Sequence, residues 1–246
     1  MISLRALNRE IVGCRKCPRL VRWREQVGKN PPRRYRGTIY WARPLPGFGD
    51  PRARLLVVGL APAAHGGNRT GRIFTGDRSG DWLYEALYHA GFANQPRSEH
   101  RGDGLKLRDC YITAAVRCAP PANKPSPAEF RNCRPYLVRE LKAFRDLRVV
   151  VALGKIAFDS FLAAFREAGG EVPRPRPRFG HGSRTVLPGG VTLLGSYHPS
   201  QQNTFTGRLT REMLAEVFAE ARKAIAKEPG RRGREKETEV ARRRGL

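Results

Sequence analysis

Side chains able to do chemistry gather in three loops, each following a short apolar segment. The first loop, residues 59–83 (GLAPAAHGGNRTGRIFTGDRSGDWL), contains Phe74, Asp77 and Asp81. An aspartate can position water or stabilise a developing cation, and an aromatic ring on a Gly-rich loop can stack on a base. The tight turn at its start, residues 59–63, contains only Gly, Leu, Ala and Pro, so any acid lies beyond the turn. One of the two aspartates is the candidate acid, and the other is expected to be structural, because an acid in the first turn of a helix is stabilised by the helix dipole.

The other two loops supply a different kind of side chain each. Asn123 lies among prolines in residues 117–127, and its amide can donate and accept at once, as recognition of a base edge requires. Asparagine is also a common turn former. His198 precedes Pro199, which keeps the preceding residue extended, so we expect the imidazole to project outward and stabilise negative charge. The alternative is a loop histidine hydrogen-bonded to the backbone.

Four of the five cysteines have a spacing typical of a metal centre. Cys14 and Cys17 form a C-x2-C pair, and Cys118 and Cys133 follow much later. Four thiols suit an iron–sulfur cluster or a tetrahedral zinc ion, and four buried apolar cysteines are the third possibility. Cys110 begins an apolar segment and is predicted to be a small core residue.

The elements that must position these loops alternate between strands and helices. Continuous apolar, β-branched runs predict strands buried on both faces, at residues 54–60, 110–118, 148–154 and 191–199. Helices are predicted at residues 80–91, 126–144, 155–170 and 210–227. This order indicates a doubly wound α/β fold with a parallel sheet, in which ligands bind beyond the carboxyl ends of the strands.

Composition narrows the class of partner. The 246 residues include 47 Lys and Arg against 22 Asp and Glu, a net charge of +25, which favours a polyanionic partner such as nucleic acid over a merely basic enzyme. We see no apolar run long enough for a membrane span and no signal peptide, and expect a cytoplasmic protein. No P-loop and no nucleophile elbow is present. We expect one domain over residues 1–227 and a basic, disordered tail over 228–246.

Taken together, the three loop motifs and the four cysteines resemble the uracil-DNA glycosylase superfamily, and most closely its family 5. The similarity extends from about Cys14 to about Ala226. It implies a three-layer α/β/α fold around a four-stranded parallel sheet, and a 4Fe-4S cluster on the four cysteines. It also implies a monomeric DNA-repair enzyme that flips uracil, and other deaminated bases such as hypoxanthine, out of DNA and hydrolyses the N-glycosidic bond.

The resemblance assigns roles to individual residues. Asp77 would orient water or stabilise the sugar cation, His198 would donate to the base O2, Phe74 would stack on the flipped base, and Asn123 would read its edge. Gly59 and Ala63 would border the base.

Two positions depart from related families. Leu60 stands where family 4 carries an acid, and Ala114 stands where other members carry asparagine. These apolar residues leave room for bulkier bases and predict relaxed selectivity for uracil.

Phosphate contacts are expected from the basic loop 29–50 and from arginines, and the resemblance places residues 201–209 in the minor groove. The residues expected to contact DNA are Arg69, Arg72, Arg78, Ser200, Phe205, Arg208 and Leu209. Phe205 or Leu209 would fill the gap that the flipped base leaves.

Two other functions are compatible with parts of the sequence. A non-catalytic nucleic-acid-binding protein with a zinc or iron–sulfur staple would explain the charge and the cysteines, but not the Gly-rich loop together with His198. An α/β enzyme acting on free nucleotides would not need a net charge of +25.

Overall fold

The computed structural model describes residues 3–226, and its central sheet matches the predicted architecture. Four fully buried parallel strands form the middle of the sheet: β2 (Leu55–Gly59), β3 (Cys110–Ala114), β4 (Val149–Leu153) and β6 (Thr192–Ser196). Their apolar, β-branched composition suits a sheet covered on both faces. The predicted parallel α/β fold is confirmed.

The sheet is wider than the four strands expected from the sequence. Two short antiparallel strands, β1 (Phe48–Gly49) and β5 (Arg184–Val186), extend it to six strands in the order β1-β3-β2-β4-β6-β5. Each has only two or three residues and lies partly exposed at an edge, so no apolar run marks it. The predicted central four-stranded parallel sheet is confirmed, and the two edge strands are an addition to it.

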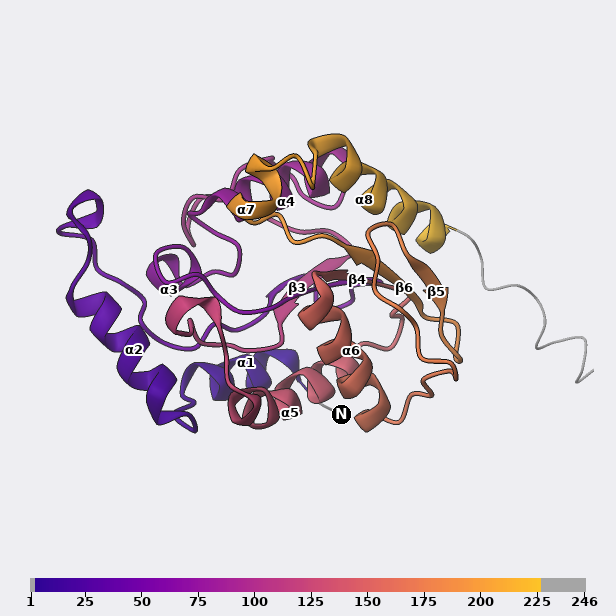
Figure 1. Cartoon of the computed structure of the whole chain (residues 1–246), viewed down its shortest axis with the longest axis horizontal. Coiled ribbons are helices and arrows are strands. Elements are labelled where there is room, and N and C mark those ends of the chain that lie inside the picture. Colours follow the sequence, from indigo (N-terminus) through magenta and orange to yellow (C-terminus); the bar gives the residue numbers. More distant parts are fainter. Residues whose placement is uncertain (1–2, 227–246) are drawn as a thin grey trace, which may run out of the picture.

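Helices cover both faces of the sheet (Figure 1). On one face lie α4 (Arg78–His89) and α8 (Arg211–Ala226), and on the other lie α1 (Leu4–Val12), α5 (Pro127–Ala143) and α6 (Lys155–Glu167). Successive strand residues point to opposite faces of the sheet. Val57 packs with the α4–α8 side, and Val58 packs with the α1–α5–α6 side. The result is the expected three-layer arrangement.

Local signals explain where several helices begin. Asp77 caps α4 through a hydrogen bond from the Gly80 N–H to its side chain, and Ser126 and Glu129 form a reciprocal capping box at the start of α5. The four predicted helices are confirmed to within a few residues. The remaining elements were not predicted from the sequence: α1, α2 (Pro18–Lys29), α3 (Gly67–Thr70), α7 (Gln201–Phe205) and two 3-10 turns, η1 (Arg33–Tyr35) and η2 (Pro121–Asn123).

Strand register brings the three chemical loops together. Gly59 pairs with Ala114 across β2 and β3, and Leu153 pairs with Ser196 across β4 and β6. Because these residues end parallel strands, the loops that follow β2, β3 and β6 leave from one edge of the sheet. Within residues 3–226, no helix is long and apolar enough to cross a membrane. The predicted tail, residues 228–246, lies outside the described residues.

Candidate active site

The first and third loops meet through two rings. The ring centroids of Phe74 and His198 lie 5.8 Å apart. Phe74 also lies against the backbone of Gly59, where a Cβ atom would be only 2.8 Å from two carbons of the phenyl ring. Glycine is therefore required at the end of β2, and the two predicted site residues share one place in the fold.

The backbone of Phe74 is left-handed, with φ +52°. An aromatic residue rarely adopts this conformation, and its occurrence at a ring-presenting position is typical of functional loops. Phe74 is buried, with 8% of the residue exposed, and His198 beside it is half-buried.

Asp77 lies a short distance along the same loop and is half-buried. Its Oδ1 accepts the Gly80 N–H at 3.0 Å, while Oδ2 faces the backbone of Gly66. Burial raises the pKa of Asp77, the Gly80 N–H partly offsets this rise, and the charge of Asp81 adds to it. A carboxylate with a raised pKa is a stronger acceptor for a proton from water.

Asp81, the other candidate acid, occupies a different surface. It is exposed in the first turn of α4 and lines a surface groove with Glu85, Arg97 and Arg211. Asp77 shares its loop with Phe74 and packs on Gly66, whereas Asp81 faces this charged groove. The two candidate acids therefore have different surroundings.

His198 lies two residues beyond the end of β6, outside any helix or strand, and is half-buried. Burial lowers the pKa of His198 to about 4, so its imidazole is neutral at pH 7. The backbone carbonyl of His198 accepts the Asn203 side-chain N–H at 2.8 Å and the Ser200 N–H at 2.8 Å. Sequence reasoning did not select Asn203, and the only signal for it is an amide residue shortly after the histidine.

Ala63 and Asn123 lie in the loops that follow β2 and β3, respectively. Asn123 is exposed in η2 with φ +56°, a left-handed conformation that asparagine tolerates, and its amide has no hydrogen-bond partner among residues 3–226. Ala63 is half-buried, and its carbonyl accepts the Asn68 N–H at 3.1 Å. The Asn123 amide is therefore available to a ligand.

The four cysteines selected from the sequence surround one small cavity, and all are free thiols. Three sulfurs accept N–H groups: Cys118 from the Arg24 guanidinium at 2.9 Å, Cys133 from the Arg117 backbone at 3.3 Å, and Cys17 from the Asn132 amide at 3.5 Å. No three His, Cys, Asp or Glu side chains of residues 3–226 are grouped so that they could hold a metal ion. The four cysteines line a cavity between them rather than converging on one point. Cys110 is fully buried in the core, as predicted.

The buried guanidinium of Arg24 indicates that this cavity needs a negative charge. Its side chain is 2% exposed, and its partners are the Cys118 sulfur and the Cys14 carbonyl. The Arg24 Nε has no partner among the described residues. A buried cation without a carboxylate needs another source of negative charge. Thiolates on a metal or cluster would supply it, whereas burial as plain thiols raises the pKa of Cys118 to about 11 and of Cys133 to about 12.

Comparison with known proteins gives the family of the chain. The family described as "Uracil DNA glycosylase superfamily" matches residues 46–222. The chain belongs to this superfamily. It is 55% identical over 222 residues to a type-5 uracil-DNA glycosylase of Mycobacterium tuberculosis (strain CDC 1551 / Oshkosh), covering 90% of this chain and 81% of the relative.

Two further relatives place the chain within the superfamily. A type-5 uracil-DNA glycosylase of Thermus thermophilus is 54% identical, with 89% of this chain and 96% of the relative covered. A type-4 uracil-DNA glycosylase of Archaeoglobus fulgidus is 34% identical, with 64% and 62% covered. Similarity is therefore greater to the type-5 relatives.

Several residues expected to contact DNA in this superfamily member are exposed around the site. Arg78 stacks on Phe205 with 4.4 Å from its guanidinium carbon to the ring centroid, and Arg208 stacks on Tyr197 at 4.5 Å. Phe205 is 65% exposed, and Ser200 is the N-cap residue of α7. These side chains come from α4 and from the segment after β6.

Two of the residues expected to contact DNA are buried, and a third, Arg69, is engaged in contacts within the protein. Arg72 is 4% exposed and ion-paired with Asp103, and Leu209 is fully buried in the core, so neither faces solvent. Arg69 donates to the carbonyls of His65 and Gly76 and stacks on Tyr35, which holds its loop closed. Sequence position alone does not distinguish a paired arginine from a free one. Phe205 remains as the wedge candidate.

Proposed function

We propose that this protein is a uracil-DNA glycosylase that hydrolyses the bond between uracil and deoxyribose in DNA and leaves an abasic site. The observation that carries the proposal is the meeting of Phe74 and His198 at the edge of the sheet, with Asp77 on the same loop. The type-5 relatives, similar over most of the chain, support the same activity.

The two neighbouring rings, Phe74 and His198, are of the kinds that bind a base that has left the helix. The flipped uracil would stack on Phe74, and the Asn123 amide would bind its polar edge. This arrangement places the base next to the imidazole of His198.

His198 stabilises the leaving base. As the C1′–N1 bond breaks, its electron pair stays on the base and negative charge builds up on the uracil oxygens. A neutral imidazole carries one N–H and can donate it to O2 without first being protonated, and its pKa of about 4 keeps His198 in that form. A fixed donor in a dry site stabilises this charge more strongly than water does.

Asp77 acts on the sugar side of the same bond. Cleavage leaves positive charge on the sugar ring, which a carboxylate stabilises. The attacking water forms the new bond to C1′ and passes its proton to Asp77, whose raised pKa suits this task. The departing base is protonated from solvent.

Apolar residues replace the acid and the amide that the other families carry here. Leu60 follows Gly59, and Ala114 is fully buried at the end of β3. Neither can reject a base by its hydrogen-bond pattern. We propose that other deaminated bases, such as hypoxanthine, are also substrates.

Cys14, Cys17, Cys118 and Cys133 would hold a 4Fe-4S cluster. The three N–H donors to sulfur and the uncompensated Arg24 fit a negatively charged cluster. The cluster would tie the segment between α1 and α2 to the β3 loop and α5, and it takes no part in base removal. The enzyme would act as a monomer and in the cytoplasm, where it meets its DNA substrate.

A single experiment tests the activity. A labelled duplex with one uracil is incubated with excess enzyme and then treated with hot alkali, which cuts abasic sites. Cleavage of this duplex and not of the same duplex with thymine is the expected result, and His198→Ala, purified in the same way, controls for contaminating enzymes. A protein that binds the uracil duplex but leaves no abasic sites would instead be the non-catalytic binder.

A further inference from the structure

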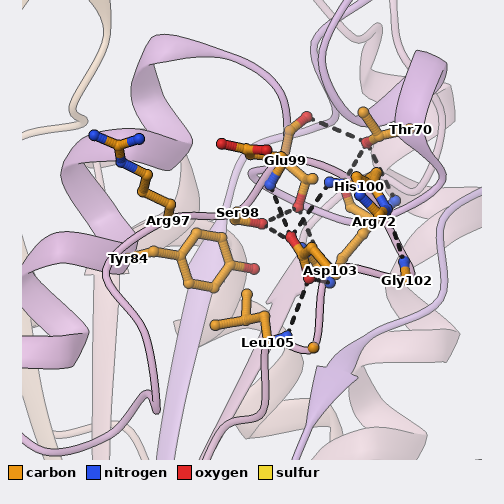
Figure 2. Close-up of polar contacts among 12 residues, drawn as sticks. Thr70, Arg72, Tyr84, Arg97, Ser98, Glu99, His100, Gly102, Asp103 and Leu105 are labelled. Carbon is orange, nitrogen blue, oxygen red and sulfur yellow. Dashed lines mark hydrogen bonds and ion pairs between the residues drawn. The ribbon is translucent and has the colours of Figure 1, made fainter.

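A buried ion pair connects the Phe74 loop to residues 98–105. The carboxylate of Asp103 accepts both terminal nitrogens of Arg72 and the backbone N–H groups of Glu99, His100 and Leu105 (Figure 2). The two side chains are 4% and 7% exposed. A pair so fully hydrogen-bonded in the interior fixes the relative position of the two segments.

Two hydroxyl groups extend this pair to the residue that follows Phe74. Arg72 donates from Nε to the Thr75 hydroxyl at 3.0 Å and from a terminal nitrogen to the Ser98 hydroxyl at 2.7 Å. These two hydroxyls lie 2.6 Å apart, and Thr75 Oγ1 lies 3.2 Å from the Ile73 carbonyl. Ser98 donates to Thr75, and Thr75 donates to the Ile73 carbonyl. Both hydroxyl protons then have an acceptor.

Hydrogen bonds hold the Ile73–Phe74 and Thr75–Gly76 peptide groups, one before Phe74 and one shortly after it. The Ile73 carbonyl also accepts the Tyr84 hydroxyl at 3.0 Å, and the Gly76 N–H donates to the Ser98 carbonyl at 3.1 Å. The Phe74 carbonyl lies against Gly80, where any Cβ atom would overlap it. The left-handed backbone of Phe74 is thus fixed before and after the residue.

We propose that Arg72, Asp103, Ser98 and Thr75 are positioning residues for base removal, which hold the Phe74 ring beside His198. They touch neither base nor sugar and act only through the backbone of Phe74. The inference rests on the proposed function, because it assigns Phe74 as the surface on which the base stacks.

Thr75 offers the sharpest test, because its hydroxyl can be removed at nearly constant shape. Thr75→Val loses the hydroxyl, and Thr75→Ser keeps it. Thr192→Val is the control, since Thr192 is a buried threonine of β6 with no side-chain hydrogen bond among the described residues. All are assayed under single-turnover conditions, well below their melting temperatures, over a range of enzyme concentrations.

Thr75→Val is expected to lower the maximal excision rate about 10-fold, because a small displacement of the base from its reacting position slows the reaction. The half-saturating enzyme concentration should stay within about 2-fold of the parent value. Thr75→Ser should restore the rate, and Thr192→Val should match the parent. A Thr75→Val enzyme that is less stable but excises at the parent rate would show that the network is only structural and would overturn the proposal.

A second readout does not depend on activity. The Phe74 ring, 5.8 Å from the imidazole, shifts the His198 Hε1 proton resonance by its ring current. This resonance should move in Thr75→Val and stay in place in Thr75→Ser and Thr192→Val. Ser98→Ala serves in the same measurements if Thr75→Val does not fold. An unmoved resonance overturns the proposal, whereas a parent that makes no abasic sites overturns the proposed function.

Discussion

The backbone of Gly66 lies directly against the carboxylate of Asp77. A Cβ atom on Gly66 would overlap Asp77 Oδ2 and lie 3.0 Å from the Asp77 Cβ. The chain therefore has room for this carboxylate only because residue 66 has no side chain. One more methyl group must displace Asp77 or move the start of α3.

Gly66→Ala should therefore resemble a loss of Asp77. We expect single-turnover excision to fall about 10- to 100-fold, the range of a positioned acid–base group or less. Gly180→Ala is the matched control, because its Cβ would meet Ser183 at an ordinary 3.7 Å. Parent-like excision by Gly66→Ala would show that the position of Asp77 does not matter.

Asp77→Asn removes the charge but keeps the shape and the acceptor for the Gly80 N–H. We expect excision about 10- to 100-fold slower, with binding to undamaged duplex unchanged or slightly tighter, because a negative charge near phosphates is gone. Asp81→Asn, in the exposed groove, should match the parent. The reverse pattern would make Asp81 the functional acid.

His198 should contribute both to rate and to the pH dependence of folding. His198→Ala should lower single-turnover excision about 100- to 1000-fold, as is typical when a donor to developing charge is lost. The pKa of His198 is about 4 in the folded chain against an ordinary 6.5, so the unfolded state binds more protons between these values.

The free energy of unfolding should therefore fall as the pH falls from about 6.5 towards 4, and this contribution is fully present only above the unfolded pKa. Urea unfolding at several pH values measures the slope, and His198→Ala should have a shallower one. Equal slopes in the two proteins would contradict the burial of a neutral imidazole.

The cysteine cluster should be needed for folding and not for chemistry. Cys17→Ala is expected to lower iron and labile-sulfide content, brown absorbance and melting temperature together, since losing a ligand loses the folding free energy coupled to binding. Cys110→Ala, which changes a core cysteine outside the cavity, should keep its iron. Full iron content in Cys17→Ala would remove Cys17 from the ligands.

DNA affinity should depend strongly on salt, because exposed arginines such as Arg78 and Arg208 release counterions from phosphates. Arg208→Gln should reduce the slope of log affinity against log salt by about 0.9 if it contacts one phosphate. Arg176→Gln is the control, because Arg176 is already paired with Asp159 of α6. Equal slopes for Arg208→Gln and the parent would exclude a phosphate contact.

The sequence reveals most of the parallel sheet because its signal is local. Each of β2, β3, β4 and β6 is a continuous apolar run, and the motifs at their ends come together through register. The short strands β1 and β5 have no such run, because their residues pair at an edge without being buried.

Burial of individual charged and apolar residues in loops has no comparable local signal. Arg72 and Arg78 look alike in sequence, yet one is paired with Asp103 inside and the other stacks on exposed Phe205. Leu209 and Phe205 differ in the same way. Asp103 and Ser98 lie in a loop without any pattern, and only the folded chain brings them to Arg72.

The left-handed backbone of Phe74 has a consequence for how the protein searches DNA for damaged bases. The unfavourable free energy of this conformation is offset once, when the chain folds, and does not arise again at each encounter with DNA. The stacking surface is therefore already formed at every position that the protein samples. The time spent at each base is then set by the opening of the DNA, so bases whose pairing is already weakened by damage are the first to enter.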